Sequence, residues 1–351
     1  MRLEHISKIR EGQILGKNIL TSDGQILLKA GVNLSDVYIN KLRNLGVCYM
    51  YIEDEMLDDV YVEDEKLTEL KQIAMKSMSS IVGKLYDGNG KGFEKAIAPV
   101  QDMMDYILNM GDVNKSLYDI KTYDNYTSIH SLDTCVMSCF LAITSGVDSC
   151  DLKDVGVGAI LHDVGKTKIP IEILNKKTRL TYEEFEEIKK HPLYGVELLK
   201  KNFMISSRII KVVEQHHERV DGRGYPYGLR DKQITKFAKI VCICDVYDAV
   251  SNDRVYRKKF KLNESYELIL SGSGSAFDKQ LVLDFKNTFA IYPLGCHVKL
   301  SNNEDGYVIK QNQGFPDRPI VRVIPKDTGN ISCFHEIDLL YNTNVVILKI
   351  I

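Results

Sequence analysis

The stretch LHDVGKTKIP, residues 161–170, decides what kind of fold this chain builds. It places a histidine and an aspartate side by side, His162 and Asp163, with Lys166 three residues after the aspartate and a glycine and a proline within the segment. Histidine and aspartate side chains are ligands that transition metals accept in proteins. A helix that merely ends in polar residues is the alternative, and the rest of the sequence has to separate the two.

The composition describes a globular chain with no bias towards a polyanionic partner. The 351 residues are 44% apolar, which suits about two domains and a sizeable core. The net charge is −2 and the pI is about 6.5, so we expect no large nucleic acid as a partner. The amino terminus lacks the apolar core of a signal peptide, and no segment approaches the roughly 20 apolar residues that span a bilayer. We therefore expect a cytoplasmic protein without a membrane span.

The eight cysteines are scattered through mostly apolar stretches and include no Cys-x-x-Cys pair. This pattern favours buried thiols in a reducing compartment over a disulfide framework or a zinc ribbon. We expect packing roles for them, including Cys242 and Cys244 in a helix-like run.

The spacing of apolar residues divides the chain into four segments. Residues 1–60 predict a small α/β module of short strands and one helix that ends at Gly46. Residues 61–119 predict connector helices, because their apolar residues recur at three- and four-residue spacing. Residues 120–287 continue as a helical bundle, and residues 288–351 alternate in a way that predicts antiparallel strands. The expected fold is mainly α, with a small N-terminal α/β module and a short C-terminal antiparallel β appendage.

Five of the eight histidines lie between residues 130 and 217, inside the predicted bundle. One histidine in a helix is most often a surface or core residue. A divalent metal needs several imidazoles and one or two carboxylates from separate elements, since no single helix surrounds an ion. The two oxygens of Asp163 can bridge two ions. The sequence therefore predicts a two-metal centre from residues on at least five segments: His130, His162, Asp163, His191, His216, His217 and Asp245.

These residues stand in blocks whose order is specific: His130, HDVGK at 162–166, HPLYG at 191–195, HHERVDGRGYP at 216–226 and DVYDAVSNDRVYR at 245–257. Over roughly residues 120–260 the blocks resemble the HD-GYP group of the HD-domain phosphohydrolases. The resemblance implies an HD-type helical bundle that hydrolyses the bacterial second messenger cyclic di-GMP to linear pGpG, in some members onward to GMP. It implies that His130, His162, Asp163 and Asp245 hold one ion and that Asp163, His191, His216 and His217 hold the other, with Asp163 bridging.

The expected cofactors are two divalent transition-metal ions. Imidazoles and carboxylates without a thiolate suit iron or manganese and could also take zinc or nickel; the resemblance puts iron first. Some members of the group bind a third ion through a glutamate one turn before the first histidine, where this chain has Tyr126. We therefore expect a binuclear centre. Two such ions would lower the pKa of a bridging water, so that it attacks the phosphodiester as hydroxide.

Other polar residues near the blocks are candidates for catalysis and substrate binding. Lys166 could neutralise charge on the phosphoryl oxygens, with a solvated surface lysine as the alternative. Asp248, one turn beyond Asp245, could orient a ligand histidine or relay a proton. The glycines of GRGYP would let the loop carry Tyr225 to the rim of the cleft, although a plain connection between helices would look the same.

Arg254 and Arg257 lie one helical turn apart, a spacing that suits a phosphate or a guanine edge. The resemblance implies that they hold the dinucleotide, and salt bridges are the alternative. Three functions stay open: an active cyclic di-GMP phosphodiesterase, a receptor that binds cyclic di-GMP with little turnover, and an HD-type hydrolase of another cyclic dinucleotide or a nucleotide ester. The connector helices could also form a homodimer seam.

Overall fold

The computed structural model describes residues 1–21, 24–62, 64–87, 90–110, 115–116, 127–201, 205–251, 262–325 and 334–351. The chain forms two compact units. One unit comprises Glu65–Val113 and Asn125–Phe285, and the other comprises Met1–Asp64, Asn114–Asp124 and Lys286–Ile351. The first and last segments of the chain thus share a unit. The four segments inferred from sequence stay predictions.

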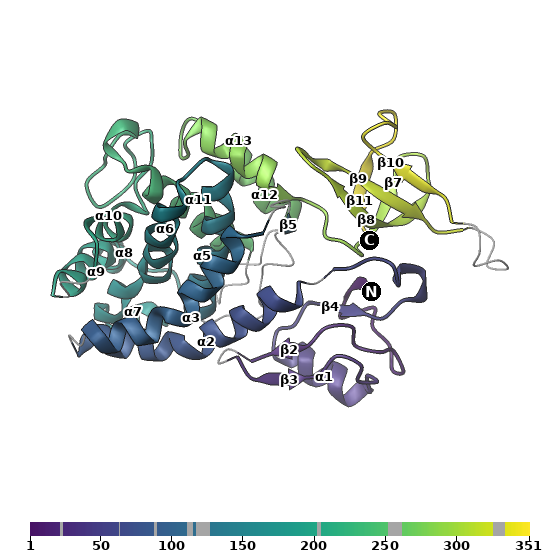
Figure 1. Cartoon of the computed structure of the whole chain (residues 1–351), viewed down its shortest axis with the longest axis horizontal. Helices are drawn as coiled ribbons and strands as arrows, with labels where there is room; N and C mark the ends of the chain where they lie inside the picture. Colours follow the sequence, from purple (N-terminus) through teal and green to yellow (C-terminus); the bar gives the residue numbers. More distant parts are fainter. Residues whose placement is uncertain are drawn as a thin grey trace. The chain divides into compact units, whose positions relative to one another are not determined.

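The larger unit is helical, as predicted (Figure 1). Helices α5 and α6 pack against each other and against α10 and α11, and the pair α2 and α3 packs on α5 and α6. The described elements are α2 (Glu65–Tyr86), α3 (Gly90–Leu108), α5 (Thr127–Thr144), α6 (Ser149–Leu161), η2 (Val164–Lys168), α7 (Ile171–Leu174), α8 (Tyr182–Ile188), α9 (His191–Lys200), α10 (Ser207–Gln215), η3 (Asp231–Gln233), α11 (Lys236–Ser251), α12 (Leu262–Ser271) and α13 (Lys279–Thr288).

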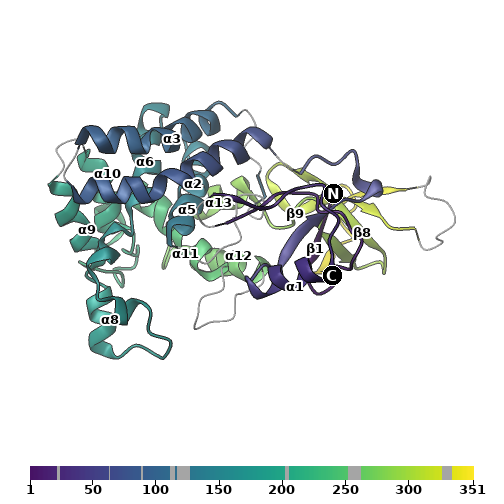
Figure 2. The same cartoon turned by 90° about the horizontal axis from the view of Figure 1, so that it is seen from below.

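The centre of this unit is α5, which is buried almost all round. Nearly every residue from 129 to 142 is buried, with Phe140 and Leu132 fully enclosed. A helix that is apolar on all sides belongs in the middle of a bundle. By contrast, Figure 2 shows α8 set away from the other helices of this unit, and its Tyr182 is accordingly 74% exposed.

The methionine-rich stripe of the connector is core. On α3 the side chains of Val100, Met103 and Met104 are fully buried at the predicted helical spacing. The thiols of Cys135, Cys139, Cys242, Cys244 and Cys296 are buried as expected. Cys150 is exposed at the start of α6, so the expectation of a buried thiol is wrong at that position.

The smaller unit holds the predicted N-terminal module and the C-terminal strands. Its module contains β1 (Arg2–His5), β2 (Ile19–Leu20), β3 (Ile26–Leu28), α1 (Asp36–Asn44), β4 (Tyr49–Ile52) and η1 (Glu55–Leu57). Strand β1 pairs antiparallel with β4, and β2 with β3. The side chain of Ser35 accepts the Tyr38 N–H at the start of α1, and Gly46 follows the helix with φ of +85°, a left-handed conformation that glycine adopts at low cost.

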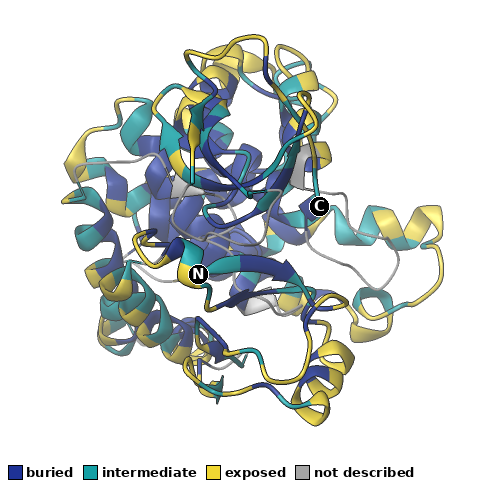
Figure 3. Cartoon of the chain, turned by 90° about the vertical axis from the view of Figure 1, so that its right-hand side faces the viewer, coloured by how far each residue is buried: buried dark blue, intermediate teal, exposed yellow. Residues whose placement is uncertain are grey.

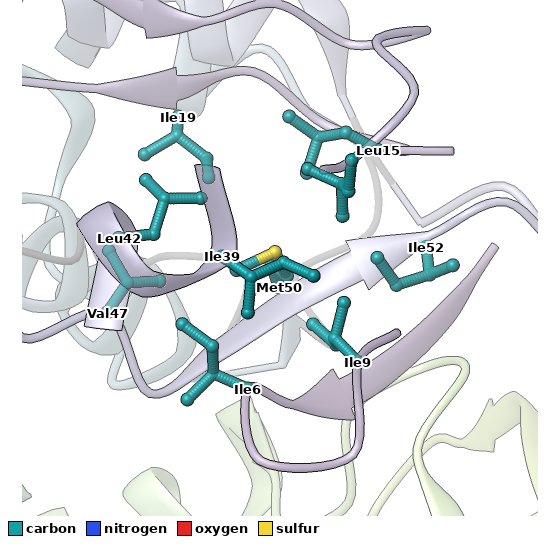
Figure 4. Packing of buried hydrophobic residues seen from close by; sticks show 10 residues of the cluster. Ile6, Ile9, Leu15, Ile19, Ile39, Leu42, Val47, Met50 and Ile52 are labelled. Atoms are coloured by element: carbon teal, nitrogen blue, oxygen red, sulfur yellow. The ribbon is translucent and has the colours of Figure 1, made fainter. Parts of the chain in front are cut away.

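One apolar cluster holds this module together (Figure 4). Ile39 and Leu42 on α1 face Met50 and Ile52 on β4, with further buried contributions from Ile6, Ile9, Leu15, Ile19, Leu34 and Val47. Figure 3 shows that, in the described residues, buried positions lie inside and exposed positions lie on loops and outer helix turns.

The C-terminal part is an antiparallel sheet of five strands in the order β10-β9-β8-β7-β11. Its strands are β7 (His297–Leu300), β8 (Asp305–Asn312), β9 (Phe315–Val323), β10 (Glu336–Asp338) and β11 (Ile347–Ile350). The short strands β5 (Lys115–Ser116) and β6 (Phe289–Ala290) form a separate parallel pair. Alternation predicted four of the five sheet strands, and the three-residue β10 was not foreseen.

Arg322 on β9 joins this sheet to the N-terminal module within the smaller unit. Its guanidinium lies 2.7 Å from Asp59 Oδ1 and 2.7 Å from Glu336 Oε1, and it donates to the Met56 carbonyl at 2.8 Å. The Leu3 N–H also donates to the Gly295 carbonyl at 2.9 Å. Segments more than 200 residues apart in sequence therefore fold as one body.

Among the helices that the model describes, none has the length and apolarity needed to cross a membrane.

A buried ion pair fixes α2 to α5. Lys71 Nζ lies 2.6 Å from Asp133 Oδ1, and the two side chains are 12% and 0% exposed. Asp133 lies three residues after His130 on α5. Removing one partner of a buried pair leaves the other charge in a poorly solvated place, which is costly.

We expect Lys71→Met to lower the free energy of unfolding of the helical unit by roughly 3 kcal/mol, because the Asp133 carboxylate loses its cation. Lys66→Met is the matched control, since Lys66 pairs with Glu69 on the exposed face of the same helix and should cost less than about 1 kcal/mol. Urea unfolding followed by circular dichroism at helical wavelengths measures both. Equal losses in the two variants would contradict the prediction.

Candidate metal centre

The seven predicted ligand residues come from separate elements and converge in the helical unit. His130 lies on α5 and Asp245 on α11. The others lie at helix ends: His162 and Asp163 directly after α6, His191 at the start of α9, and His216 and His217 directly after α10. No two neighbouring helices alone could supply this set, as the sequence argument required.

The donor atoms form two clusters. In the first, His130, His162 and Asp245 each offer an atom within 4.8 Å of the others. In the second, atoms of Asp163, His191, His216 and His217 lie within the same distance of one another. Groups of three or four imidazole and carboxylate donors at this spacing suit divalent transition ions.

Asp163 faces both clusters, one with each carboxylate oxygen. Its Oδ1 lies 3.3 Å from His191 Nε2 and 4.0 Å from His216 Nε2. Its Oδ2 lies 3.4 Å from His162 Nε2 and 4.0 Å from His130 Nε2. Each carboxylate oxygen of Asp163 thus faces one cluster, and the bridging of two ions by this residue stays a prediction.

Three of the imidazoles are held by backbone carbonyls at helix ends. In each, Nδ1 lies close to the carbonyl oxygen of the residue three positions earlier, at 2.7 Å for His162, 2.8 Å for His191 and 2.9 Å for His216. A carbonyl only accepts hydrogen bonds, so Nδ1 carries the proton and Nε2 presents its lone pair to the centre. This is the tautomer that a metal ligand needs.

His130 is held by a carboxylate instead. Its Nδ1 lies 2.6 Å from Oδ2 of the fully buried Asp248, and its Nε2 lies 3.0 Å from Asp245 Oδ1. Burial alone would lower the pKa of His130, but the hydrogen bonds with Asp245 and Asp248 outweigh it and raise the pKa to about 10. The field at this cluster therefore favours positive charge.

Two imidazoles of the second cluster, those of His216 and His217, are kept neutral by burial. Burial lowers the pKa of His217 to about 3 and holds the pKa of His216 well below its usual range. Burial would raise the pKa of Asp163, but the nearby Lys166 and His162 hold it well below the usual value. Neutral imidazoles around an ionised carboxylate are the protonation states that bind a cation.

The donor set also fits metal ions because some of its atoms lack other partners. His162 Nε2 and Asp163 Oδ1 are buried and, within the described residues, accept no hydrogen bond. Buried polar atoms of this kind are rare in folded proteins, because leaving them unsatisfied costs free energy. A cation bound in each cluster would satisfy these atoms.

The remaining predicted site residues fall in two groups. Lys166 Nζ lies 2.5 Å from Asp163 Oδ2 and is a quarter exposed, and the Tyr225 ring stacks on His217 with centroids 4.6 Å apart. Arg254, Arg257 and Tyr126 lie outside the described residues. The catalytic and substrate-binding roles of all of them stay predictions.

Sequence reasoning missed Glu218. It is 2% exposed, and its carboxylate accepts the backbone N–H groups of Tyr227 at 2.7 Å and Leu229 at 2.9 Å. It thus ties the loop of residues 222–229, here called the GYP loop, to the end of α10. The sequence did show an acidic residue directly after the paired histidines. Its partners, however, are backbone N–H groups 9 and 11 residues away, and no pattern of side chains identifies such groups.

Comparison with known proteins defines the class. Residues 131–281 match the model of the HD domain family, and residues 297–351 match that of a KOW domain associated with the HD domain. The helical unit with its His and Asp clusters is therefore an HD domain, and the C-terminal sheet is KOW-like.

Within that class, the chain is similar to cyclic di-GMP phosphodiesterases. A cyclic di-GMP phosphodiesterase of Pseudomonas aeruginosa is 32% identical over 263 residues, which are 74% of this chain and 63% of that protein. The cyclic di-GMP phosphodiesterase PdeB of Borreliella burgdorferi is 29% identical over 65% of this chain and 60% of its own length. The chain thus spans about three fifths of these curated relatives.

A solved structure supports the fold. An HDG"Y"P protein from Bdellovibrio bacteriovorus matches with a TM-score of 0.53 and 18% identity, over 81% of this chain and 97% of that one. At this identity the likeness concerns architecture only.

Gly165 lies beside the centre, where the backbones of η2 and α9 approach each other closely. A Cβ atom at this position would lie 1.9 Å from the His191 carbonyl oxygen and 2.5 Å from the Gly195 nitrogen. Both obstacles are backbone atoms, so no side-chain rotation relieves the clash. The absence of a Cβ therefore lets η2 pass close to α9, and this passage sets Asp163 beside His191.

We expect Gly165→Ala to destabilise the helical unit by about 1–3 kcal/mol and to weaken metal binding, because η2 must move away from α9. Gly83→Ala on α2 is the control: nothing lies within 4 Å of its added Cβ, so the change should stabilise the helix by about 0.5–1 kcal/mol. Thermal unfolding and metal analysis after loading compare the two. Wild-type metal content and stability in Gly165→Ala would refute the assignment.

Proposed function

We propose that this HD-domain phosphohydrolase hydrolyses a phosphodiester bond of cyclic di-GMP to give linear pGpG. The observation that carries the proposal is the placement of Asp163, which turns one carboxylate oxygen to each of two histidine clusters. The two relatives described above, which are named as cyclic di-GMP phosphodiesterases, support the choice of substrate. Cytoplasmic location and a homodimer through α2 and α3 stay predictions.

The proposed ligand sets follow the two clusters. His130, His162, Asp245 and Asp163 Oδ2 would hold one ion, and His191, His216, His217 and Asp163 Oδ1 would hold the other. When bound, such a pair of ions supplies the Lewis acidity that activates water and balances the charge of a phosphoryl group during in-line displacement.

The chemistry of the donors supports iron first and manganese second. The clusters contain imidazole and carboxylate groups and no thiol. Burial raises the pKa of Cys242, on the same helix as Asp245, to about 12, so this side chain stays a thiol at neutral pH. Mixed nitrogen and oxygen sites of this kind suit Fe and Mn more than ions that select thiolates.

The side chains around the clusters have distinct proposed tasks. The Lys166 ammonium reaches Asp163 Oδ2, so it lies beside the centre, where it would offset negative charge on the phosphoryl oxygens. Asp248 holds the Nδ1–H of His130 and thereby turns Nε2 of that ring to the first cluster. Tyr225 would contact the substrate at the rim. Arg254 and Arg257, proposed from the sequence, would hold the phosphate or guanine groups of the dinucleotide.

We expect Asp163→Ala to remove both ions and to lower turnover of cyclic di-GMP by about a thousandfold or more, because the bridging ligand is lost while the helices stay folded. Asp87→Ala, at an exposed carboxylate after α2, should keep turnover and metal content. The measurements are metal stoichiometry per chain after anaerobic purification and chromatography of the nucleotide products.

The same assay separates the three functions left open by the sequence. Turnover to pGpG by the metal-loaded chain supports the proposal. Binding of cyclic di-GMP without turnover would indicate a receptor, and neither binding nor turnover would indicate a different nucleotide substrate. Near-normal turnover by Asp163→Ala would remove the metal centre from the reaction altogether.

We also expect the double variant Arg254→Ala/Arg257→Ala to raise KM for cyclic di-GMP by about tenfold or more while two ions remain bound, since charge-assisted hydrogen bonds to phosphate contribute roughly 1.5–3 kcal/mol each. Steady-state kinetics and metal analysis on the same preparation check this. An unchanged KM would exclude both residues from the substrate site.

A further inference from the structure

His217 is held differently from the other imidazoles of the centre. His162, His191 and His216 are fixed by backbone carbonyls, and His130 is fixed by Asp248. Within the part of the chain that the model describes, the ring nitrogens of His217 make no hydrogen bond; the nearest carboxylate oxygen is Asp245 Oδ2 at 3.8 Å. Its orientation must therefore come from packing.

Tyr225 supplies the stacked part of that packing. Its ring and that of His217 have centroids 4.6 Å apart and planes 30° from parallel, and the tilted His216 ring has its centroid 4.1 Å from that of His217. The Tyr225 N–H also donates to the His217 carbonyl at 3.2 Å. This bond holds the backbone of Tyr225 beside His217, and the course of the loop places the ring against that imidazole.

Glu218 sets that course. Its two carboxylate oxygens accept N–H groups from Tyr227 and Leu229, which lie just beyond Tyr225 in the GYP loop. The loop also packs directly on the same segment, because a Cβ at Gly224 would lie 2.5 Å from Glu218 Cα. Backbone N–H groups bonded to a buried carboxylate form strong, charge-assisted hydrogen bonds. The carboxylate thus anchors the loop at two points after Tyr225.

We propose that Glu218 is a positioning residue for the second ion: it holds the GYP loop so that Tyr225 stacks on His217 and orients this imidazole towards Asp163, His191 and His216. The inference rests on the proposed metal centre and adds to it a residue that contacts neither an ion nor substrate. Groups that orient metal-bound imidazoles usually act through a hydrogen bond. Here an aromatic stack, anchored by a carboxylate, has the same task.

The proposal predicts an asymmetric effect on the two ions. The first cluster is oriented by Asp248 and by the Ala159 carbonyl, neither of which belongs to the GYP loop. Loss of Glu218 should therefore weaken binding of the ion at His217 and leave the ion at His130 in place. A residue that only stabilises the fold would weaken both ions to a similar extent.

We expect Glu218→Ala to raise one of the two dissociation constants for Mn²⁺ by about 10- to 100-fold and to change the other by less than about twofold, in line with the effect of losing groups that orient ligands. Titration of the metal-free full chain with Mn²⁺ against a chelating dye measures both constants. Glu218→Gln keeps one acceptor oxygen and should give an intermediate value.

Two further variants make the test specific. Glu214→Gln is the matched control, because Glu214 accepts the Tyr227 hydroxyl at 3.1 Å and the Lys211 ammonium at 2.6 Å and, among the described residues, no N–H of the loop backbone. Tyr225→Leu keeps Glu218 but removes the stack, so it should reproduce the loss at the second ion. It also serves if Glu218→Ala fails to fold. If Glu218→Ala or Tyr225→Leu bound both ions with wild-type constants, or lost both equally, the proposal would be overturned.

A fluorescence measurement tests the loop without metal or substrate. The chain contains no tryptophan, so Tyr225→Trp introduces a single fluorophore against His217. Adding Glu218→Ala to this variant should shift its emission to longer wavelength as the ring moves into water, and an unchanged spectrum would contradict the anchoring role. Failure of cyclic di-GMP turnover with these shifts intact would count against the proposed function alone.

Discussion

The carboxylate of Asp163, buried between two groups of imidazoles, is the feature on which the helical unit depends. An ionised carboxylate in such a place costs several kcal/mol unless nearby groups compensate it. Lys166 supplies one compensating charge from a single turn away, and the histidines surround the other oxygen. Because these partners come from η2, α9 and the end of α10, the charge is tolerable only when all of these elements are in place. The fold of the helical unit and the geometry of the site therefore depend on the same contacts.

The ends of helices hold three of the imidazoles that surround this carboxylate. The last carbonyls of a helix have no partner within it, and they need a donor from elsewhere. His162 and His216 donate from Nδ1 to the carbonyls of Ala159 and Val213, near the ends of α6 and α10, and His191 does the same at the end of α8. One hydrogen bond therefore satisfies a helix terminus and fixes the tautomer of a ligand. This explains why these three histidines lie close after the end of a helix, whereas His130, which a carboxylate holds, lies within α5.

The sequence predicted the parts of this arrangement that local patterns encode. The helical bundle, four strands of the C-terminal sheet and the gathering of the histidine and aspartate side chains follow from spacing and from motifs of 13 residues or fewer. It did not predict that residues 1–64 and 286–351 form one unit, because contacts such as Arg322 with Asp59 join residues 263 positions apart. Glu218 was missed for a related reason. Its partners are backbone N–H groups, which every residue but proline carries and which no side-chain pattern distinguishes.

The imidazoles of the centre differ in what holds them and in how far they are exposed. His162, His191 and His216 are at most 1% exposed, whereas His130 is 13% and His217 21% exposed. His130 and His217 are therefore the imidazoles of the centre that solvent reaches most. His130 lies on α5, which the ion pair between Lys71 and Asp133 fixes to α2. The carboxylate of Asp248 can therefore hold Nδ1 of the His130 imidazole, on the side of the ring away from Nε2. His217 lies on a turn with the GYP loop beside it, and there an aromatic face can orient the ring while leaving the ligand atoms open to the centre.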